Sequence, residues 1–328
     1  MHDLSRLLDN FHRCHIAVIG DLMLDEYLWG HIERISPEAP VPILNVIRRS
    51  STLGGAGNVV ENLRSLGVAV TVLGVLGRDE TGHQVCELLR SHGVDTNGVI
   101  LDPSRKSTRK ARLMSLEHSQ QVFRLDEEST STIESQIEDK MIGMIAALGS
   151  GIQAIVCSDY LKGVLSEHVL AATFTVAGKR GIRSIVGPKD SSPEKYRGAS
   201  VLMPNSRELM QLSGKKPNGE VSLGDSARGL IENLSLEGLL VTRGSEGMSL
   251  FERSEANLRR VDIPTTARSV YDVTGAGDTA IAAFAAAVAS GSDLETAARL
   301  ANVTAGIKVG KRGTASVSVE EIRMSLKT

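Results

Sequence analysis

His15-Ile16-Ala17-Val18-Ile19-Gly20-Asp21 is a short apolar run, rich in β-branched residues, that ends in Gly-Asp. This pattern predicts a buried parallel strand with a polar residue at its carboxyl end. Ligands of open α/β proteins bind at that end of the sheet. Residues 58–66 place apolar side chains at helical spacing before Gly67, and residues 68–75 predict the next strand. The first part of the chain therefore predicts a strand, a helix and a strand.

The same alternation continues along the chain. Further helices are predicted at 84–89, 167–177 and 279–290, and further strands at 154–157, 184–186, 201–203 and 238–242. Such alternation predicts an α/β fold, a mostly parallel sheet with helices on both faces.

Two stretches of the chain break this alternation. Residues 25–50 and 96–126 contain β-like runs, and we expect antiparallel strands there, outside the main sheet. We expect the two insertions to form a small β lid over the carboxyl end of the core. No internal repeat or low-complexity linker occurs, so residues 1–328 are expected to form one domain.

Composition describes an ordinary globular protein, with 41% hydrophobic residues, 23% charged residues and a net charge of −2. This charge offers no general attraction to nucleic acid or to an anionic membrane. Cys14, Cys86 and Cys157 have no metal-ligand spacing, which favours reduced thiols in a cytoplasmic protein. No signal peptide and no apolar stretch of membrane-spanning length occurs. We therefore expect the protein to stay in the cytoplasm, with any anion-binding site confined to a local part of the molecule.

The most informative loop is Asp272-Val273-Thr274-Gly275-Ala276-Gly277-Asp278, which precedes the apolar helix predicted at 279–290. The first N–H groups of a helix lack intrahelical partners and bind anions. The small residues 275–277 would let the backbone approach a phosphate, while Asp278 supplies a carboxylate. Asp is also a common helix N-cap, so the loop alone leaves both roles open.

This heptapeptide and its helix resemble the C-terminal signature of the ribokinase (PfkB) family of carbohydrate kinases, and the resemblance extends over nearly all of the chain. It implies a ribokinase-like three-layer α/β/α core with a small β-sheet lid. It also implies that Asp278 removes a proton from the sugar hydroxyl that attacks the γ-phosphate of ATP. Gly275, Ala276 and Gly277 would then stabilise the phosphoryl group through their amides.

A second stretch, Gly54-Gly55-Ala56-Gly57-Asn58, resembles the family's N-terminal signature. The resemblance implies that Gly54 and Gly55 approach the sugar and that Asn58 contacts its hydroxyls. Asp21 matches the sugar-binding end of the family's first strand. Taken alone, the glycine loop would be a weak signal and Asp21 a strand-end cap.

The nucleotide side is indicated by three matches. Pro204-Asn205-Ser206-Arg207-Glu208 matches the family's Asn-x-x-Glu motif, which organises Mg²⁺ and its waters, although alone it would be a capping box. The stretch 241–247 resembles the family's turn near the ATP phosphates and ribose, and Asn302 fits a position near adenine. The nucleotide-binding residues implied are Lys189, Asn205, Ser206, Arg207, Glu208, Thr242, Arg243, Gly244, Gly247, Gly277 and Asn302.

Two details of the family pattern concern ions and charge. Relatives often carry an aspartate where this chain has Gly187, so an acidic role is absent there, while Lys189 nearby could reach a phosphate. Many relatives bind a monovalent cation such as K⁺ beside the catalytic loop. Asp272 matches one contributor to that site.

A cluster of cations in the predicted lid suggests a phosphorylated sugar. Charge-assisted hydrogen bonds from these side chains could hold a substrate phosphate, although a solvated basic turn is the simpler alternative. Arg124 and Asp126 lie on the other predicted lid strand and could either line the substrate site or pair with each other at its edge. Asp159 and Lys162 follow a core strand and should face the cleft. The clustered cations are Arg105, Lys106, Arg109, Lys110 and Arg112.

The stretch Arg34-Ile35-Ser36-Pro37-Glu38-Ala39-Pro40-Val41-Pro42, with Gly20-Asp21 and residues 158–163, resembles one subgroup of the family. That subgroup phosphorylates O1 of D-glycero-D-manno-heptose 7-phosphate, giving the 1,7-bisphosphate used in lipopolysaccharide core synthesis. Some of its members are fused to a nucleotidyltransferase domain with a His-x-x-His motif. This motif is absent here, so we expect a stand-alone kinase that dimerises through exposed lid edges.

Three other functions deserve comparison. Another ribokinase-type kinase would act on fructose phosphate, ribose or a nucleoside. A catalytically silent sugar or nucleotide sensor is disfavoured because Asp278, Asn205 and Glu208 are all present. A nicotinamide dehydrogenase is disfavoured because residues 54–57 lack the Gly-x-Gly-x-x-Gly spacing.

Overall fold

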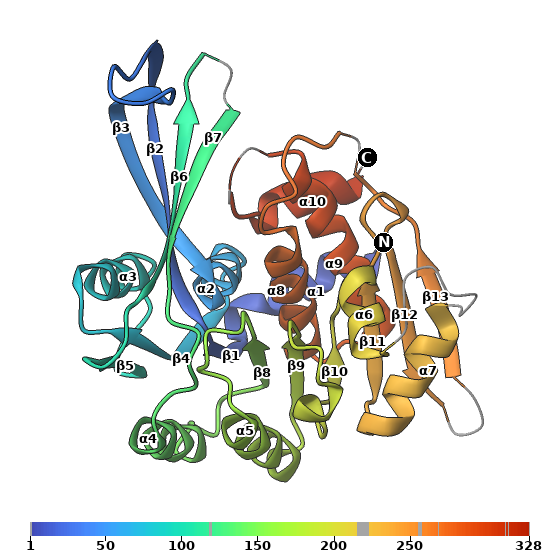
Figure 1. Ribbon diagram of the computed structural model, residues 1–328. Coiled ribbons are helices and arrows are strands. Elements are labelled where there is room, and N and C mark those ends of the chain that lie inside the picture. Colours follow the sequence, from blue (N-terminus) through green and yellow to red (C-terminus); the bar gives the residue numbers. More distant parts are fainter. Residues whose placement is uncertain are drawn as a thin grey trace.

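The central feature of the computed structural model is a long, mostly parallel sheet (Figure 1). The structure describes residues 2–117, 120–214, 223–254, 258–267, 269–311, 313 and 315–327. Within these residues nine strands form the main sheet. In spatial order they are β13 (Leu258–Ile263), β12 (Met248–Arg253), β11 (Gly238–Thr242), β10 (Val201–Leu202), β9 (Arg183–Gly187), β8 (Ala154–Ser158), β1 (His15–Gly20), β4 (Ala69–Gly77) and β5 (Val99–Asp102).

Parallel pairing dominates this sheet, as the alternation of elements predicts. β1 pairs in parallel with β4 on one side and β8 on the other. β12 and β13 are the exception, because each runs antiparallel to its neighbour. The carboxyl ends of β1, β8, β9, β10 and β11 therefore meet along one edge, where the loops that follow them lie together. The predicted α/β class is confirmed.

Helices cover both faces of the sheet because its strands are apolar on both sides. In β8, Ala154 and Val156 belong to the core on one face, while Ile155 and Cys157 belong to the core on the other. One helical layer contains α1 (His2–Asn10), α2 (Ala56–Ser65), α3 (Glu80–Ser91), α8 (Ala276–Ala289), α9 (Leu294–Val309) and α10 (Val319–Lys327). The other contains α4 (Ser135–Ala146), α5 (Glu167–Arg180), α6 (Ser206–Leu212) and α7 (Leu223–Leu234).

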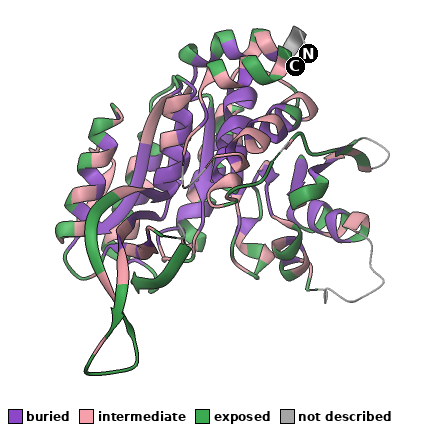
Figure 2. Cartoon of the chain, turned by 90° about the horizontal axis from the view of Figure 1, so that it is seen from above, coloured by how far each residue is buried: buried purple, intermediate pink, exposed green. Residues whose placement is uncertain are grey.

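The two insertions form a second, four-stranded sheet that stands away from the helical layers (Figure 1). Its order is β3 (Pro42–Gly55), β2 (Leu22–Ile35), β6 (Thr108–Ser115) and β7 (Gln120–Glu127). Figure 2 shows that its outer end is largely exposed. The expected stretch 96–126 divides between the two sheets, because β5 pairs with β4 in the main sheet.

Each insertion forms an antiparallel pair of strands, as expected from sequence, and the two insertions meet through a parallel pair. β2–β3 and β6–β7 are antiparallel hairpins, but β2 and β6 are parallel to each other. The physical reason is that each of these two strands is the first of its hairpin. Both therefore leave the core in the same direction.

Asp21 joins the end of β1 to the loop after β8. Its side chain is only 1% exposed, and its carboxylate accepts hydrogen bonds from the backbone N–H groups of Tyr160 (2.7 Å), Lys162 (3.1 Å) and Val164 (3.2 Å). Burial raises the pKa of Asp21, whereas these three hydrogen bonds oppose that shift. The carboxylate thus fixes the loop that carries Tyr160 into the site.

The three cysteines are free and buried in the core. Cys14, Cys86 and Cys157 act there as small apolar residues. Across the described part of the chain, helices are too short or too polar to cross a membrane.

Candidate functional site

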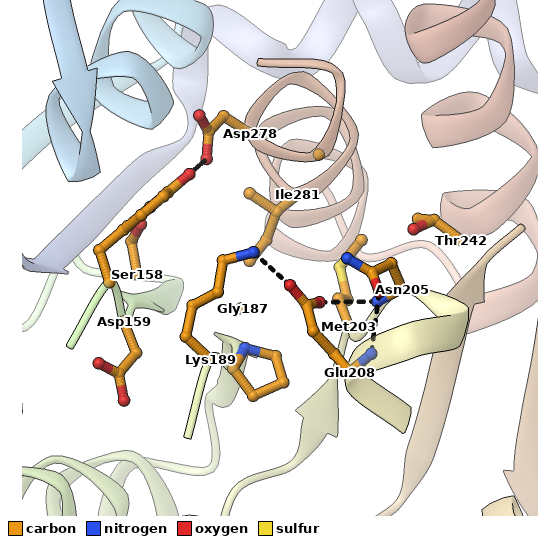
Figure 3. Close-up of a pocket in the computed structure, with 13 residues that line it drawn as sticks. Ser158, Asp159, Gly187, Lys189, Met203, Asn205, Glu208, Thr242, Asp278 and Ile281 are labelled. Carbon is orange, nitrogen blue, oxygen red and sulfur yellow. Dashed lines mark hydrogen bonds and ion pairs between the residues drawn. The ribbon is translucent and has the colours of Figure 1, made fainter. Parts of the chain in front are cut away.

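Asp278 lies in the first turn of α8 with a buried carboxylate. Its Oδ2 accepts a hydrogen bond from Asn58 Nδ2 (2.7 Å), and its Oδ1 accepts one from the Tyr160 hydroxyl (2.7 Å). The helix begins after Gly275, so Asp278 is not the N-cap, and no side-chain cap is formed there. The carboxylate is therefore held by other parts of the chain and points away from its own helix, toward the cavity shown in Figure 3.

Two neighbouring side chains orient Asn58, one of the two hydrogen-bond donors to Asp278. Thr279 Oγ1 donates to Asn62 Oδ1 (2.8 Å), and Asn62 Nδ2 donates to Asn58 Oδ1 (3.1 Å), which fixes the orientation of the Asn58 amide. Gly275 has φ of 75°, and a Cβ added there would lie 2.7 Å from Asn58 Nδ2. Only glycine satisfies both the left-handed backbone and this close approach.

The electrostatic environment makes Asp278 a stronger base than an exposed aspartate. Burial raises the pKa of Asp278 to about 6, although the hydrogen bonds from Tyr160 and Asn58 oppose this shift. Burial, followed by the charge of Asp278, raises the pKa of Tyr160 well above its usual value. Tyr160 therefore remains a hydrogen-bond donor. At neutral pH the carboxylate is ionised yet able to accept a proton.

A cavity of about 90 Å³ lies beside Asp278, between the ends of the strands and the start of α8 (Figure 3). Gly277, Lys189 and Glu208 line it together with Asp278 and Thr242. The Lys189 ammonium forms an ion pair with Glu208 on the wall of this cavity. Lys189 and Gly277, in the first turn of α8, thus line the same small space, and a cation beside a helix N-terminus suits a phosphoryl group.

Asn205 and Glu208 form a capping box at the start of α6. Asn205 Oδ1 accepts from the Glu208 N–H (2.9 Å), and Glu208 Oε2 accepts from the Asn205 N–H (2.8 Å). Within the described residues no group of three carboxylate, imidazole or thiol side chains converges on a metal position. Glu208 would hold Mg²⁺ through water, because its Oε1 pairs with Lys189 and its Oε2 with the Asn205 N–H, and this ion keeps several waters. Asn205 would orient that carboxylate.

A larger apolar cavity of about 350 Å³ adjoins this space and shares Thr242 and Gly277 with it. Asn302 lies on its wall, and its Nδ2 donates to the Pro264 carbonyl (2.8 Å). Its other lining residues include Gly244, Gly247, Met248, Val273, Ala276, Ala280, Ala305 and Val309. The size and apolar walls suit an adenine ring whose phosphates reach the smaller cavity.

Three residues expected on the nucleotide side lie outside these two cavities. The guanidinium of Arg243 binds Glu246, Ser249 and Asp262 around its own turn. Ser206 and Arg207 are exposed in the first turn of α6.

The structure separates the basic residues expected to bind a sugar phosphate. Strand alternation places Lys110 and Arg112 on one face of β6 and Arg109 on the other. Arg112 forms an ion pair with Asp25 (2.6 Å), whose charge contributes, after burial, to the raised pKa of Asp278. Arg109 instead binds Glu26 on the far face. Lys110 and Arg112 therefore lie on the face directed toward the Asp278 carboxylate.

The remaining lid cations fall into two groups. Arg105, Lys106 and Lys162 line a narrow space beside Asp21, and the Arg105 guanidinium donates to the Lys162 carbonyl. Arg124, on β7, binds its neighbour Asp126 through two hydrogen bonds of 2.8 Å.

Asp159 was expected to face the cleft, but its carboxylate is engaged elsewhere. Its Oδ2 accepts hydrogen bonds from Lys195 Nζ (2.7 Å) and the Tyr196 hydroxyl (2.8 Å). Figure 3 shows this side chain directed away from Asp278, although Asp159 lines the cavity wall. Sequence reasoning missed Tyr160 as a partner of Asp278, and only its place after a predicted strand could have indicated it.

Comparison with known proteins relates nearly the whole chain to one family of enzymes. The model of the pfkB family carbohydrate kinases matches residues 14–322. Bifunctional protein HldE of Pelobacter propionicus is 45% identical over 97% of this chain, and that of Geobacter metallireducens is 48% identical over 93%. The chain spans 64% and 61% of the lengths of these two relatives.

Solved structures share the fold at low sequence identity. Arabidopsis thaliana ribokinase, complexed with ribose and ATP, has a TM-score of 0.73 and 19% identity, covering 96% of this chain and 99% of that one. Escherichia coli phosphofructokinase-2, in complex with potassium, has a TM-score of 0.79 and 18% identity, covering 96% and 98%. Both comparisons support the ribokinase-like arrangement of the two sheets.

Replacing the proposed base should separate catalysis from folding. We expect Asp278→Asn to lower turnover by at least about a hundredfold while ATP binding is retained. The temperature of unfolding at neutral pH should stay the same or rise, because the variant no longer buries a charge. Turnover and thermal unfolding should be measured beside Asp139→Asn, an exposed control on α4. Near-wild-type turnover would remove Asp278 as the base.

The pH dependence provides a second test of the Asp278 environment. Turnover should fall below about pH 6 as Asp278 becomes protonated. Tyr160→Phe removes a hydrogen bond to the ionised carboxylate, so the pKa of Asp278 should rise. The acidic limb of the plot of turnover against pH should therefore move to higher pH. An acidic limb at the same pH in both proteins would contradict this role of Tyr160.

Proposed function

The chain belongs to the pfkB family of carbohydrate kinases and is an ATP-dependent sugar kinase, and we propose that its sugar substrate is D-glycero-D-manno-heptose 7-phosphate. Phosphorylation at O1 would give the 1,7-bisphosphate, a precursor of lipopolysaccharide core heptose. Two findings support this substrate: the resemblance of residues 34–42 to the heptose 7-phosphate kinase subgroup, and relatives named HldE at 45–48% identity.

The observation that carries the proposal is an unpaired lysine, Lys110, on the face of the small sheet that is directed toward Asp278. In the described part of the chain, Lys110 Nζ forms no hydrogen bond or ion pair, although Arg112 beside it binds Asp25. Burial, followed by the nearby charge of Lys162, lowers the pKa of Lys110. A sugar phosphate bound between Lys110 and Lys162 would offset the repulsion between these two positive charges.

In the proposed reaction, Asp278 accepts the proton of the O1 hydroxyl as that oxygen attacks the γ-phosphorus of ATP. The bond from O1 to phosphorus forms, the bond from phosphorus to the bridging oxygen breaks, and ADP leaves. The amides of Gly275, Ala276 and Gly277 would donate to the transferred group. Mg²⁺, when bound near Glu208, would neutralise charge on the phosphates.

The small sheet is proposed to act as the lid of a single kinase domain spanning the chain. It carries Asp25, Lys110 and Arg112 toward Asp278, so its movement would bring sugar-binding groups to the base and exclude water. Because the proposed reaction consumes ATP, we place it in the cytoplasm.

Substrate choice should be tested with a panel of sugars, each supplied with ATP. We expect the highest kcat/KM for heptose 7-phosphate, with much weaker use of ribose, fructose 6-phosphate and the unphosphorylated heptose. Lys110→Met should raise the KM for heptose 7-phosphate by about tenfold or more and leave the KM for ATP nearly unchanged. Lys140→Met, an exposed change on α4, is the matched control.

Two outcomes would count against this substrate. Strong turnover of another sugar beside weak turnover of heptose 7-phosphate would reassign the enzyme within its family. An unchanged KM for heptose 7-phosphate in Lys110→Met would remove Lys110 from the phosphate site.

We also propose that the kinase forms a homodimer through the small sheet. Phe123 and Leu125 on β7 are 58% and 48% exposed, and they share a face with Leu113, opposite Lys110 and Arg112. Large exposed apolar side chains on an edge strand favour association with another chain. A second copy is the simplest partner, because two identical sheets can pair these faces across a twofold axis.

The dimer can be tested by mass in solution. We expect a dimeric mass for the wild type at micromolar concentration and a monomeric mass for Phe123→Glu, because the introduced charge would be buried at the interface. Thr175→Glu, an exposed change on α5, should remain dimeric. A monomeric wild type would exclude this interface.

A further inference from the structure

Lys308 is a buried lysine that the proposed reaction does not use. It lies on α9, is 1% exposed, and donates from Nζ to two backbone carbonyls, those of Asp272 (3.2 Å) and Gly313 (2.8 Å). None of the described carboxylates forms an ion pair with it. Burying an ammonium without an ion pair costs free energy, so its presence calls for a reason.

The position of Lys308 connects it to the catalytic loop. The Asp272 carbonyl stands at the start of the loop that ends at Asp278, and a Cβ added to Gly275 would lie 3.9 Å from Lys308 Cε. The Asp272 carboxylate accepts from the Thr274 N–H (2.9 Å) and the Gly313 N–H (3.0 Å). The loop and the segment after α9 are thus joined twice, by an ammonium and by a carboxylate.

This arrangement does not fit the monovalent cation expected beside Asp272. Potassium ions in proteins are held by backbone carbonyl oxygens that replace their hydration shell. Two such oxygens converge here, but the Lys308 ammonium already binds both. An ammonium carries the same single charge as K⁺ and bonds to carbonyl oxygens through its N–H groups.

We propose that Lys308 is a built-in monovalent cation that makes this kinase independent of K⁺. Its charge and its two carbonyl contacts hold residues 272–278 in the shape that presents the Gly275–Gly277 amides and Asp278 to the phosphate. Lys308 is therefore a positioning residue. The inference rests on membership of the kinase family and not on the choice of heptose as substrate.

The first experiment uses the wild-type protein and needs no variant. Turnover with the best sugar substrate, and affinity for a non-hydrolysable ATP analogue by calorimetry, should be measured in sodium, potassium, caesium or tetramethylammonium chloride at constant ionic strength. We expect both quantities to agree within about twofold in all four salts, because the charge is already present. Severalfold activation or tighter binding of the analogue in potassium alone would overturn the proposal.

The second experiment removes the ammonium. Lys308→Met and Lys308→Gly should each lower turnover by at least about tenfold and weaken binding of the ATP analogue, because the loop loses its cation. In Lys308→Gly, potassium or ethylammonium should restore part of the activity, part of the affinity and part of the unfolding temperature. Lys308→Met should not respond, because its side chain still fills the space.

Lys311→Met is the matched control for these variants. Lys311 also donates to a backbone carbonyl, that of Ser316 (2.7 Å), but it is partly exposed and ion-paired with Glu321. It should keep wild-type turnover in every salt. Wild-type turnover and analogue affinity in Lys308→Met would show that the ammonium is dispensable and would overturn the proposal. If both Lys308 variants fail to fold, the salt series on the wild type decides.

Discussion

The desolvated carboxylate of Asp278 is the constraint on which the rest of the site depends. Keeping it ionised in a buried position costs the folded state on the order of 3 kcal/mol at neutral pH. Hydrogen bonds from Asn58 and Tyr160 to the carboxylate offset part of the cost of burial. These two residues lie 220 and 118 residues away from Asp278 in the chain. Both are neutral donors, so they orient the carboxylate without supplying the charge that would make it a weak base.

The parallel sheet is what allows partners so distant in sequence to meet. The ends of β1 and β8 lie side by side, so Asp21 can hold the loop that carries Tyr160. The end of β11 lies farther along the same edge, beyond β9 and β10, and Thr242 there lines both the phosphate-sized cavity and the apolar one. The small sheet also sorts its side chains, because those of alternate residues point to opposite faces. Lys110 lies on the face directed toward Asp278, and Phe123 lies on the opposite face.

Much of the fold was predictable because local signals agreed with the final arrangement. The run ending at Asp21, the strand before Ser158 and the helix after Gly277 all formed near their predicted positions. Other features depended on distant contacts. β12 and β13 have no parallel-strand pattern, and the parallel pairing of β2 with β6 follows from the direction in which both hairpins leave the core.

The sequence by itself was enough to predict kinase chemistry, because the small residues before Asp278, the amide at Asn58 and the carboxylate at Glu208 are residue types that can be recognised without the fold. Only the tertiary structure decided which of the many cations lie on the same face of the small sheet as Asp25. Arg109 and Lys110 are adjacent in the chain and both positively charged, yet the pleat directs them to opposite faces of the small sheet. Lys308 lies outside all the sequence motifs described above. Its contact with the Asp272 and Gly313 carbonyls arises from how α9 packs against the loop of residues 272–278, and such a contact exists only in three dimensions.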